Sequence, residues 1–100
     1  MMIKKQFTPK KTVCKVTFTV AGEKASESVA LLGDFNNWDP KTDHLVKKNG
    51  AWETTIRLNA NEEFKFRYLI DGSTWENDEA ADAYVGNEFG TEDSVINTNV

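Results

Sequence analysis

The sequence is poor in the residues that build disulfides, metal centres and membrane spans. Among 100 residues there is one cysteine, Cys14, and one histidine, His44, and no apolar run approaches the roughly 20 residues that cross a bilayer. A lone cysteine excludes an internal disulfide or a thiolate metal cluster. Residues 1–6 also lack the apolar stretch of a secretory signal. We therefore expect one small cytoplasmic domain that does not contact a membrane.

Positive charge is scarce and unevenly placed. The formal net charge is −4, and residues 1–11 hold four lysines and no acid, which leaves eight bases against sixteen acids on residues 12–100. Nucleic-acid binding would favour a basic stripe on the folded body, so we expect no nucleic-acid partner. Residues 1–11 lack periodicity and contain Pro9, and we predict a flexible basic leader there.

Long helical patterns are also missing, and short alternating segments take their place. Apolar residues recur with the period-two spacing of half-buried strands, most clearly over 63–70. Asn49-Gly50 is typical of a tight hairpin turn, and Asp71-Gly72 predicts another. We expect about seven short strands, at 13–20, 28–32, 44–48, 51–58, 63–70, 73–77 and 95–96. This pattern predicts an all-β fold, an antiparallel β-sandwich formed by one domain over residues 12–100.

The segment 76–93 carries seven acids and no Lys or Arg, and we expect a long loop there. It lacks the fixed glycine and terminal glutamate of a calcium loop, so no metal site is predicted. The chain has no Gly-x-Ser-x-Gly motif. A small sandwich also leaves little room for the paired carboxylates of a glycosidase. We therefore expect no catalytic residue and no cofactor.

The three tryptophans stand in different surroundings. Trp52 keeps step with Ile56 and Leu58, so we expect it in the core, and Cys14 is in phase with buried positions of its own strand. Trp38 and Trp75 are flanked by polar residues. An exposed aromatic of this kind usually marks a contact surface.

Aromatic rings surrounded by amides and carboxylates are suited to a sugar. A pyranose has an apolar face of C–H bonds that lies on a π-surface, and its hydroxyls need donors and acceptors around the rim. Arg67 is expected to point outward from its strand, where it offers fixed donors to neighbouring hydroxyls. A neutral ligand of this kind needs no basic patch.

Several segments resemble one known family. Val29-Ala-Leu-Leu-Gly-Asp-Phe-Asn-Asn-Trp38 strongly resembles the signature of the family-48 carbohydrate-binding modules, also called isoamylase N-terminal or early-set domains. That family includes the glycogen-binding domain of the AMP-activated protein kinase β subunit. The resemblance continues through residues 49–52, 66–75 and 89–96, and covers about 13–98. It implies an immunoglobulin-like β-sandwich that binds α-1,4-glucans such as glycogen or starch.

The resemblance also assigns carbohydrate-binding residues. Trp38 and Trp75 match the family's two stacking tryptophans, and Arg67 stands where a Lys or Arg often bonds sugar hydroxyls. The remaining matches form the rim in the late loop. They are Phe89, in the place of a leucine, Thr91, which matches a threonine, and Asp93, which replaces an asparagine.

Two functions remain open. The first is non-catalytic α-glucan binding that targets or assists a glycogen- or starch-active enzyme. The second is a docking module of the same fold, whose exposed aromatics are covered by a partner protein. A sugar titration followed by tryptophan fluorescence separates the two.

Overall fold

The fold is an antiparallel β-sandwich. A computed structural model describes residues 1–99, and in that range it contains ten strands and two short 3-10 turns. The strands are β1 (Met2–Phe7), β2 (Val13–Ala21), β3 (Val29–Gly33), β4 (Asp43–His44), β5 (Val46–Lys48), β6 (Ala51–Asn59), β7 (Glu63–Ile70), β8 (Thr74–Glu76), β9 (Ala83–Gly86) and β10 (Glu92–Asn97). The turns are η1 (Gly22–Lys24) and η2 (Asp34–Asn36).

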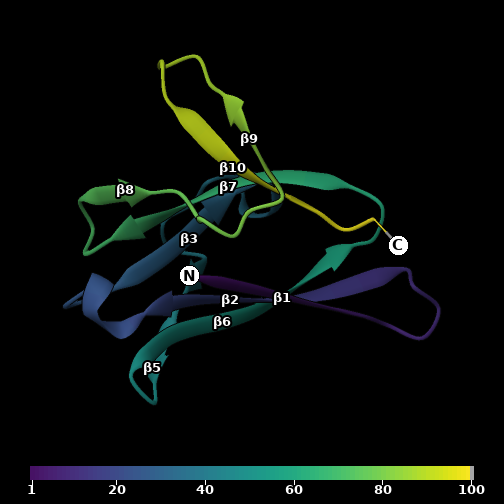
Figure 1. Cartoon of the computed structure of the whole chain (residues 1–100), viewed down its shortest axis with the longest axis horizontal. Helices are drawn as coiled ribbons and strands as arrows, with labels where there is room; N and C mark the ends of the chain where they lie inside the picture. The colour runs from purple at the N-terminus through teal and green to yellow at the C-terminus, as the bar shows by residue number, and fades with distance from the viewer. Residues whose placement is uncertain (100) are drawn as a thin grey trace.

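The strands form two sheets that lie face to face (Figure 1). One sheet has four strands in the order β1-β2-β6-β5. The other has the order β4-β3-β7-β10-β9, with β8 paired to β7. Every strand pair is antiparallel. The predicted all-β sandwich is confirmed, with more strands than the sequence indicated.

The core lies between the sheets and is rich in aromatic side chains. Phe18 of β2 and Phe66 of β7 are fully buried, and their rings meet edge to face with centroids 5.2 Å apart. Trp52 is 8% exposed and Cys14 is fully buried, as their phase along the strands predicts. Burial raises the pKa of the Cys14 thiol, since it disfavours the thiolate.

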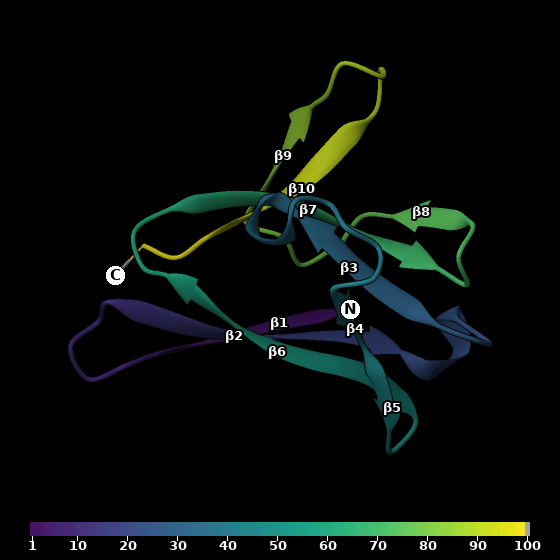
Figure 2. The same cartoon turned by 180° about the vertical axis from the view of Figure 1, so that it is seen from behind.

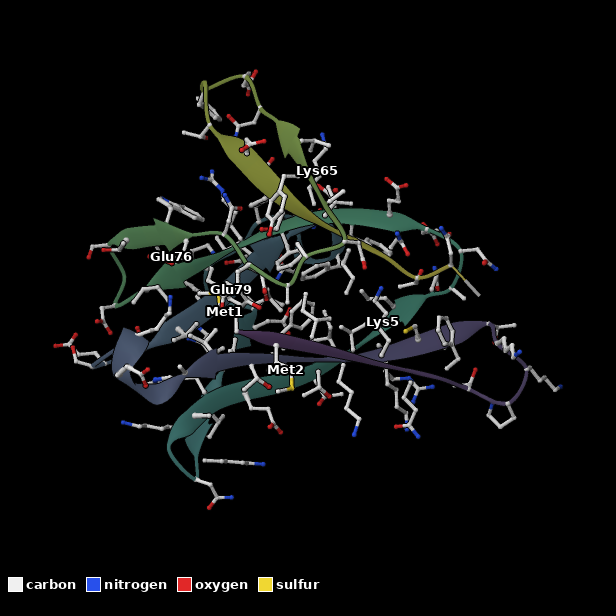
Figure 3. The ribbon with its side chains drawn as sticks, viewed as in Figure 1. Met1, Met2, Lys5, Lys65, Glu76 and Glu79 are labelled. Atoms are coloured by element: carbon white, nitrogen blue, oxygen red, sulfur yellow. The ribbon has the colours of Figure 1, made fainter. Side chains whose placement is uncertain are left out.

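The prediction of a flexible leader is wrong for residues 2–7. This segment forms β1 and pairs with β2 from Met2↔Thr19 to Phe7↔Cys14. Met2 points away from the sandwich, whereas Met1 lies beside Glu79 (Figure 3). Of the alternate positions that face inward, the middle one is Lys5, whose Nζ binds Asp82 Oδ2 at 2.7 Å. Lys5 interrupts the alternation of apolar residues, so the sequence alone does not indicate a strand. The acid that neutralises Lys5 is 77 residues away in the chain.

The segment 44–48, expected to be one strand, is divided between the sheets. β4 pairs with β3 and β5 pairs with β6. Leu45 separates them, is 4% exposed and belongs to the core. Its N–H donates to Val29 O at 2.9 Å. The chain crosses from one layer to the other at this residue because burial of Leu45 is available only between the layers.

The acidic segment 76–93 is more ordered than a long loop. It contains β9, which pairs with β10 in a hairpin that projects from the sheet (Figure 1). Asp78 is fully buried. Its Oδ2 accepts the Tyr68 hydroxyl at 2.6 Å, and its N–H donates to Ser94 Oγ at 2.9 Å. Burial, together with the Asp78 charge and hydrogen bond, raises the pKa of Tyr68 well above its usual value.

Candidate functional site

The turn after β3 is anchored to the core on one side. Phe35 of η2 packs against Phe18 and Phe64, with ring centroids 6.3 Å and 6.1 Å apart. The turn also lies close to β7, since a Cβ on Gly33 would be 2.6 Å from Lys65 O. Glycine is therefore required here by the close backbone approach. These contacts place the end of the turn at the outer surface of the six-stranded sheet.

Asn36 closes this turn with its side chain. It is 8% exposed, and its Oδ1 accepts the Gly33 N–H at 3.0 Å. Its Nδ2 donates to Leu31 O at 2.8 Å and to Asp43 Oδ2 at 2.9 Å. The Trp38 N–H adds a bond to Gly33 O at 3.0 Å. A buried amide with this many partners holds one conformation, and it fixes the backbone that carries Trp38.

Trp38 is half-buried and is held in an uncommon backbone conformation. Asn37 and Trp38 both have φ of +57°, in the left-handed region. The indole Nε1 of Trp38 donates to Asp34 Oδ1 at 3.1 Å. Asp34 Oδ2 accepts the Lys65 N–H at 2.8 Å. The carboxylate of Asp34 therefore joins the indole to the backbone of β7.

The outer face of β7 provides the floor of the site. Arg67 faces outward as expected, but its side chain is only 18% exposed. Its guanidinium lies 4.9 Å from the ring centroid of Trp75 on β8, a cation–π distance. Its Nε is 3.2 Å from Asp93 Oδ1. These two atoms are within ion-pair range but are not aligned for a hydrogen bond. Trp75 is 46% exposed.

The β9–β10 hairpin forms the opposite wall. Its tip carries Phe89, the most exposed large apolar residue among those described, at 79%. Asn87 shapes the tip, because its Oδ1 accepts the N–H of Phe89 at 3.0 Å and that of Thr91 at 3.2 Å. Asn87 Nδ2 donates to Asp93 Oδ1 at 3.2 Å. Asp93 is 7% exposed, so it supports the hairpin and Arg67 from below.

A cleft of about 520 Å³ lies between the two walls. Its lining residues are Asp34, Trp38, Lys65, Arg67, Gly86, Asn87, Glu88, Phe89 and Asp93. Figure 2 shows turn η2 beside the base of the β9–β10 hairpin. Four of the six residues proposed from the sequence line this cleft. Trp75 adjoins it through Arg67, and Thr91 lies behind its wall, bonded to Asn87.

Sequence reasoning missed four lining side chains, those of Asp34, Lys65, Asn87 and Glu88. Asp34 lies inside the quoted Gly-Asp-Phe-Asn-Asn-Trp motif, and Lys65 shares the outward phase of Arg67. Both signals were therefore available in the sequence. Asn87 precedes Gly90, which has φ of +79°, and its bond to the Phe89 N–H two residues further on is the local pattern of an Asx turn.

The cleft combines aromatic rings with donors and acceptors of both charges. Lys65 and Arg67 stand beside Asp34, Glu88 and Asp93, so no strong field of one sign is expected within it. Such a lining suits an uncharged ligand with one apolar face. Within residues 1–99, no group of three or more His, Cys, Asp or Glu side chains could hold a metal ion. The described part of the chain also has no helix long and apolar enough to span a bilayer.

Comparison with known proteins agrees with this chemistry. A 38-residue stretch is 50% identical to a 1,4-alpha-glucan-branching enzyme of Debaryomyces hansenii. The match covers 36% of this chain, and the chain spans 5% of the length of that enzyme. Residues 7–85, from β1 to β9, match the family described as carbohydrate-binding module 48, or isoamylase N-terminal domain. The chain therefore belongs to the carbohydrate-binding module 48 family.

Proposed function

We propose that the cleft binds α-1,4-glucan and that the chain does no chemistry on it. The observation that carries this proposal is the pairing of Trp38 and Phe89 across a cleft floored by Arg67. Aromatic faces take the C–H face of glucose units, and the basic and acidic groups between them take the hydroxyls. Membership of a carbohydrate-binding family supports the same ligand class.

Each of the remaining residues has a part in this proposal. Arg67 covers one face of the Trp75 ring, so a sugar stacks on the opposite face of the ring. Asp93 accepts from Asn87 and lies beside Arg67, and it acts by holding Arg67 in place. Thr91 keeps the hairpin tip closed through Asn87.

The role in a longer protein is part of the proposal. The matched relative is named for an activity on 1,4-α-glucan, and this chain corresponds to a small share of it. We infer that the module keeps a glycogen- or starch-active enzyme at its polymer. Such a role needs only a surface that binds the polymer, and the cleft would supply it.

The affinity for one oligosaccharide should be modest. A shallow site with a few ring contacts and rim hydrogen bonds corresponds to a Kd in the micromolar to millimolar range, or about −4 to −8 kcal/mol. Retention on a polymer would be stronger, because many equivalent sites follow one another along the chain of sugars.

A titration with maltoheptaose or β-cyclodextrin, followed by tryptophan fluorescence, tests the proposal. We expect a saturable response in the wild type and a loss of affinity of at least about tenfold in Trp38→Ala and Trp75→Ala. Met2→Ala is the matched control, because Met2 is 62% exposed on the four-stranded sheet. A cello-oligosaccharide of similar length controls for the linkage. Folded protein that ignores millimolar maltoheptaose would overturn glucan binding and favour the protein-docking role.

A further inference from the structure

We propose that Asp34 is a positioning residue that fixes the plane of the Trp38 indole for glucan stacking, an inference that rests on the proposed function. Asp34 Oδ1 accepts the indole N–H at 3.1 Å, and Oδ2 accepts the Lys65 backbone N–H at 2.8 Å. One carboxylate therefore connects the ring on the first wall of the cleft to the strand that forms its floor. Rotation of the indole about its side-chain bonds would break the first of these bonds.

The chemistry of this site requires a carboxylate. Both groups that meet Asp34 are N–H donors, and an ionised carboxylate accepts through both oxygens. An asparagine at the same place could accept only one of them, because its NH₂ group would face the other donor. Hydrogen bonds to a charged acceptor are also about twice as strong as neutral ones.

The bond also limits what Trp38 can offer a sugar. Its N–H is committed to Asp34, so the ring presents its π-face and no free donor. Among the described residues, Trp38 is the one tryptophan whose indole N–H meets a carboxylate, and Trp52 Nε1 is buried without an acceptor. Hydroxyl recognition is consequently left to the polar groups on the floor, such as Arg67 and Lys65.

The indole resonances in a ¹H–¹⁵N NMR spectrum give the first test. We expect the Trp38 N–H signal to exchange slowly with solvent both in the free protein and in the presence of maltoheptaose, because its acceptor belongs to the protein. In Asp34→Asn this signal should exchange faster. Asp39→Asn is the matched control, since Asp39 is an exposed acid of the same turn whose carboxylate accepts the Lys41 N–H.

The second test is a double-mutant cycle on maltoheptaose affinity. Asp34→Asn should weaken binding by about 2- to 10-fold, because the ring must then be ordered when the sugar binds. Trp38→Phe keeps a stacking ring but has no N–H. In that background Asp34→Asn should change the affinity by less than about twofold, since there is then no indole N–H for Asp34 to hold. Thermal unfolding of each variant measures any loss of stability separately.

The outcomes separate this inference from the proposed function. Equal losses of affinity on Asp34→Asn in both backgrounds would overturn the positioning role, and so would a Trp38 N–H that exchanges rapidly with solvent in the wild type. If Asp34→Asn does not fold, the wild-type spectrum decides, because a rapidly exchanging Trp38 N–H contradicts the bond. If the wild type does not bind maltoheptaose, the proposed function fails, and the exchange rates still test the bond between Asp34 and Trp38.

Discussion

Trp38 shows how much the site depends on one residue in an uncommon conformation. Its φ of +57° follows an identical value at Asn37, and the left-handed region costs an ordinary L-residue about 1–2 kcal/mol. The turn accepts this cost because Phe35 and Asn36 fix it from the core side. Strain of this kind often lies where a side chain must be presented to a ligand.

The strain at Trp38 predicts a difference between two truncations. Both Trp38→Gly and Trp38→Ala should lose glucan affinity, because each removes the ring. Trp38→Gly should nevertheless have a free energy of unfolding about 1 kcal/mol higher than Trp38→Ala, since glycine adopts positive φ without a Cβ clash. Urea unfolding measures the difference. Equal stabilities of the two variants would contradict the left-handed conformation.

Asp71 stabilises the fold through the charge of its side chain. Its carboxylate accepts the backbone N–H groups of Ser26, Glu27 and Ser28 at 3.1, 2.6 and 3.0 Å. These bonds, led by the one from Ser28, lower the pKa of Asp71 to about 2. The carboxylate therefore joins the turn after β7 to the loop before β3.

The lowered pKa predicts a loss of stability in acid. Because the folded pKa lies below the unfolded one, the contribution of Asp71 is complete above about pH 4 and is lost as the pH falls towards 2. Melting temperatures measured from pH 6 to pH 2 should therefore fall less steeply for Asp71→Asn than for the wild type. Glu27→Gln removes a carboxyl group from the same loop and should keep the wild-type slope.

At the scale of elements, strand β1 makes the start of the chain part of the folded sandwich. Its inward side chains Ile3 and Phe7 pack on the core, while Lys4 and Gln6 alternate outward. If this segment were a flexible leader, substitution at any of these four positions would have the same small effect on stability. Because it is a strand, substitution of Ile3 or Phe7 should lower the free energy of unfolding.

We therefore expect Ile3→Ala to lower the free energy of unfolding by about 1–3 kcal/mol, less than a fully buried isoleucine would because Ile3 is half-buried. Gln6→Ala, an exposed site on the same strand, should stay within about 0.5 kcal/mol of the wild type. Chemical denaturation of both variants checks this. An Ile3→Ala variant as stable as the wild type would contradict the strand β1 and favour a flexible segment at residues 2–7.

At the scale of the molecule, charge is divided between the sheets rather than between a leader and a body. Strands β1, β2, β5 and β6 together carry six basic residues and one acid. The strands of the other sheet carry two basic residues and five acids. The cleft opens on this second sheet, and its two basic residues are Lys65 and Arg67.

Although the cleft contains charged side chains, salt should have little effect on glucan binding. The ligand is neutral, and the Arg67–Asp93 pair is partly buried, where salt screens it less. We expect the Kd for maltoheptaose to change by less than about twofold between about 0.05 M and about 0.5 M salt. Calorimetric titrations at the two concentrations measure this. A steep salt dependence would mean that the ligand binds through charge instead.

Much of the fold could be predicted from local patterns. The alternation in β7 identified both the core residues Phe66 and Tyr68 and the outward Arg67. Asn49 and Gly50 both have positive φ, as a type I′ turn requires. The phase of Trp52 identified it as a core residue. These features depend on neighbours in the chain, which the sequence contains directly.

The sequence by itself therefore determined the strands with a clear period, the turns between them and the aromatic candidates for the site. Only the tertiary structure decided that residues 2–7 and 83–86 are strands. In the first, Lys5 interrupts the apolar period and is neutralised by Asp82, 77 residues away. In the second, Val85 is the one side chain that is partly buried, so the segment has no apolar period. The tertiary structure also decided the role of Asp34. A hydrogen bond needs its two groups about 3 Å apart, and 31 residues separate Asp34 from Lys65, so folding alone brings them within that distance.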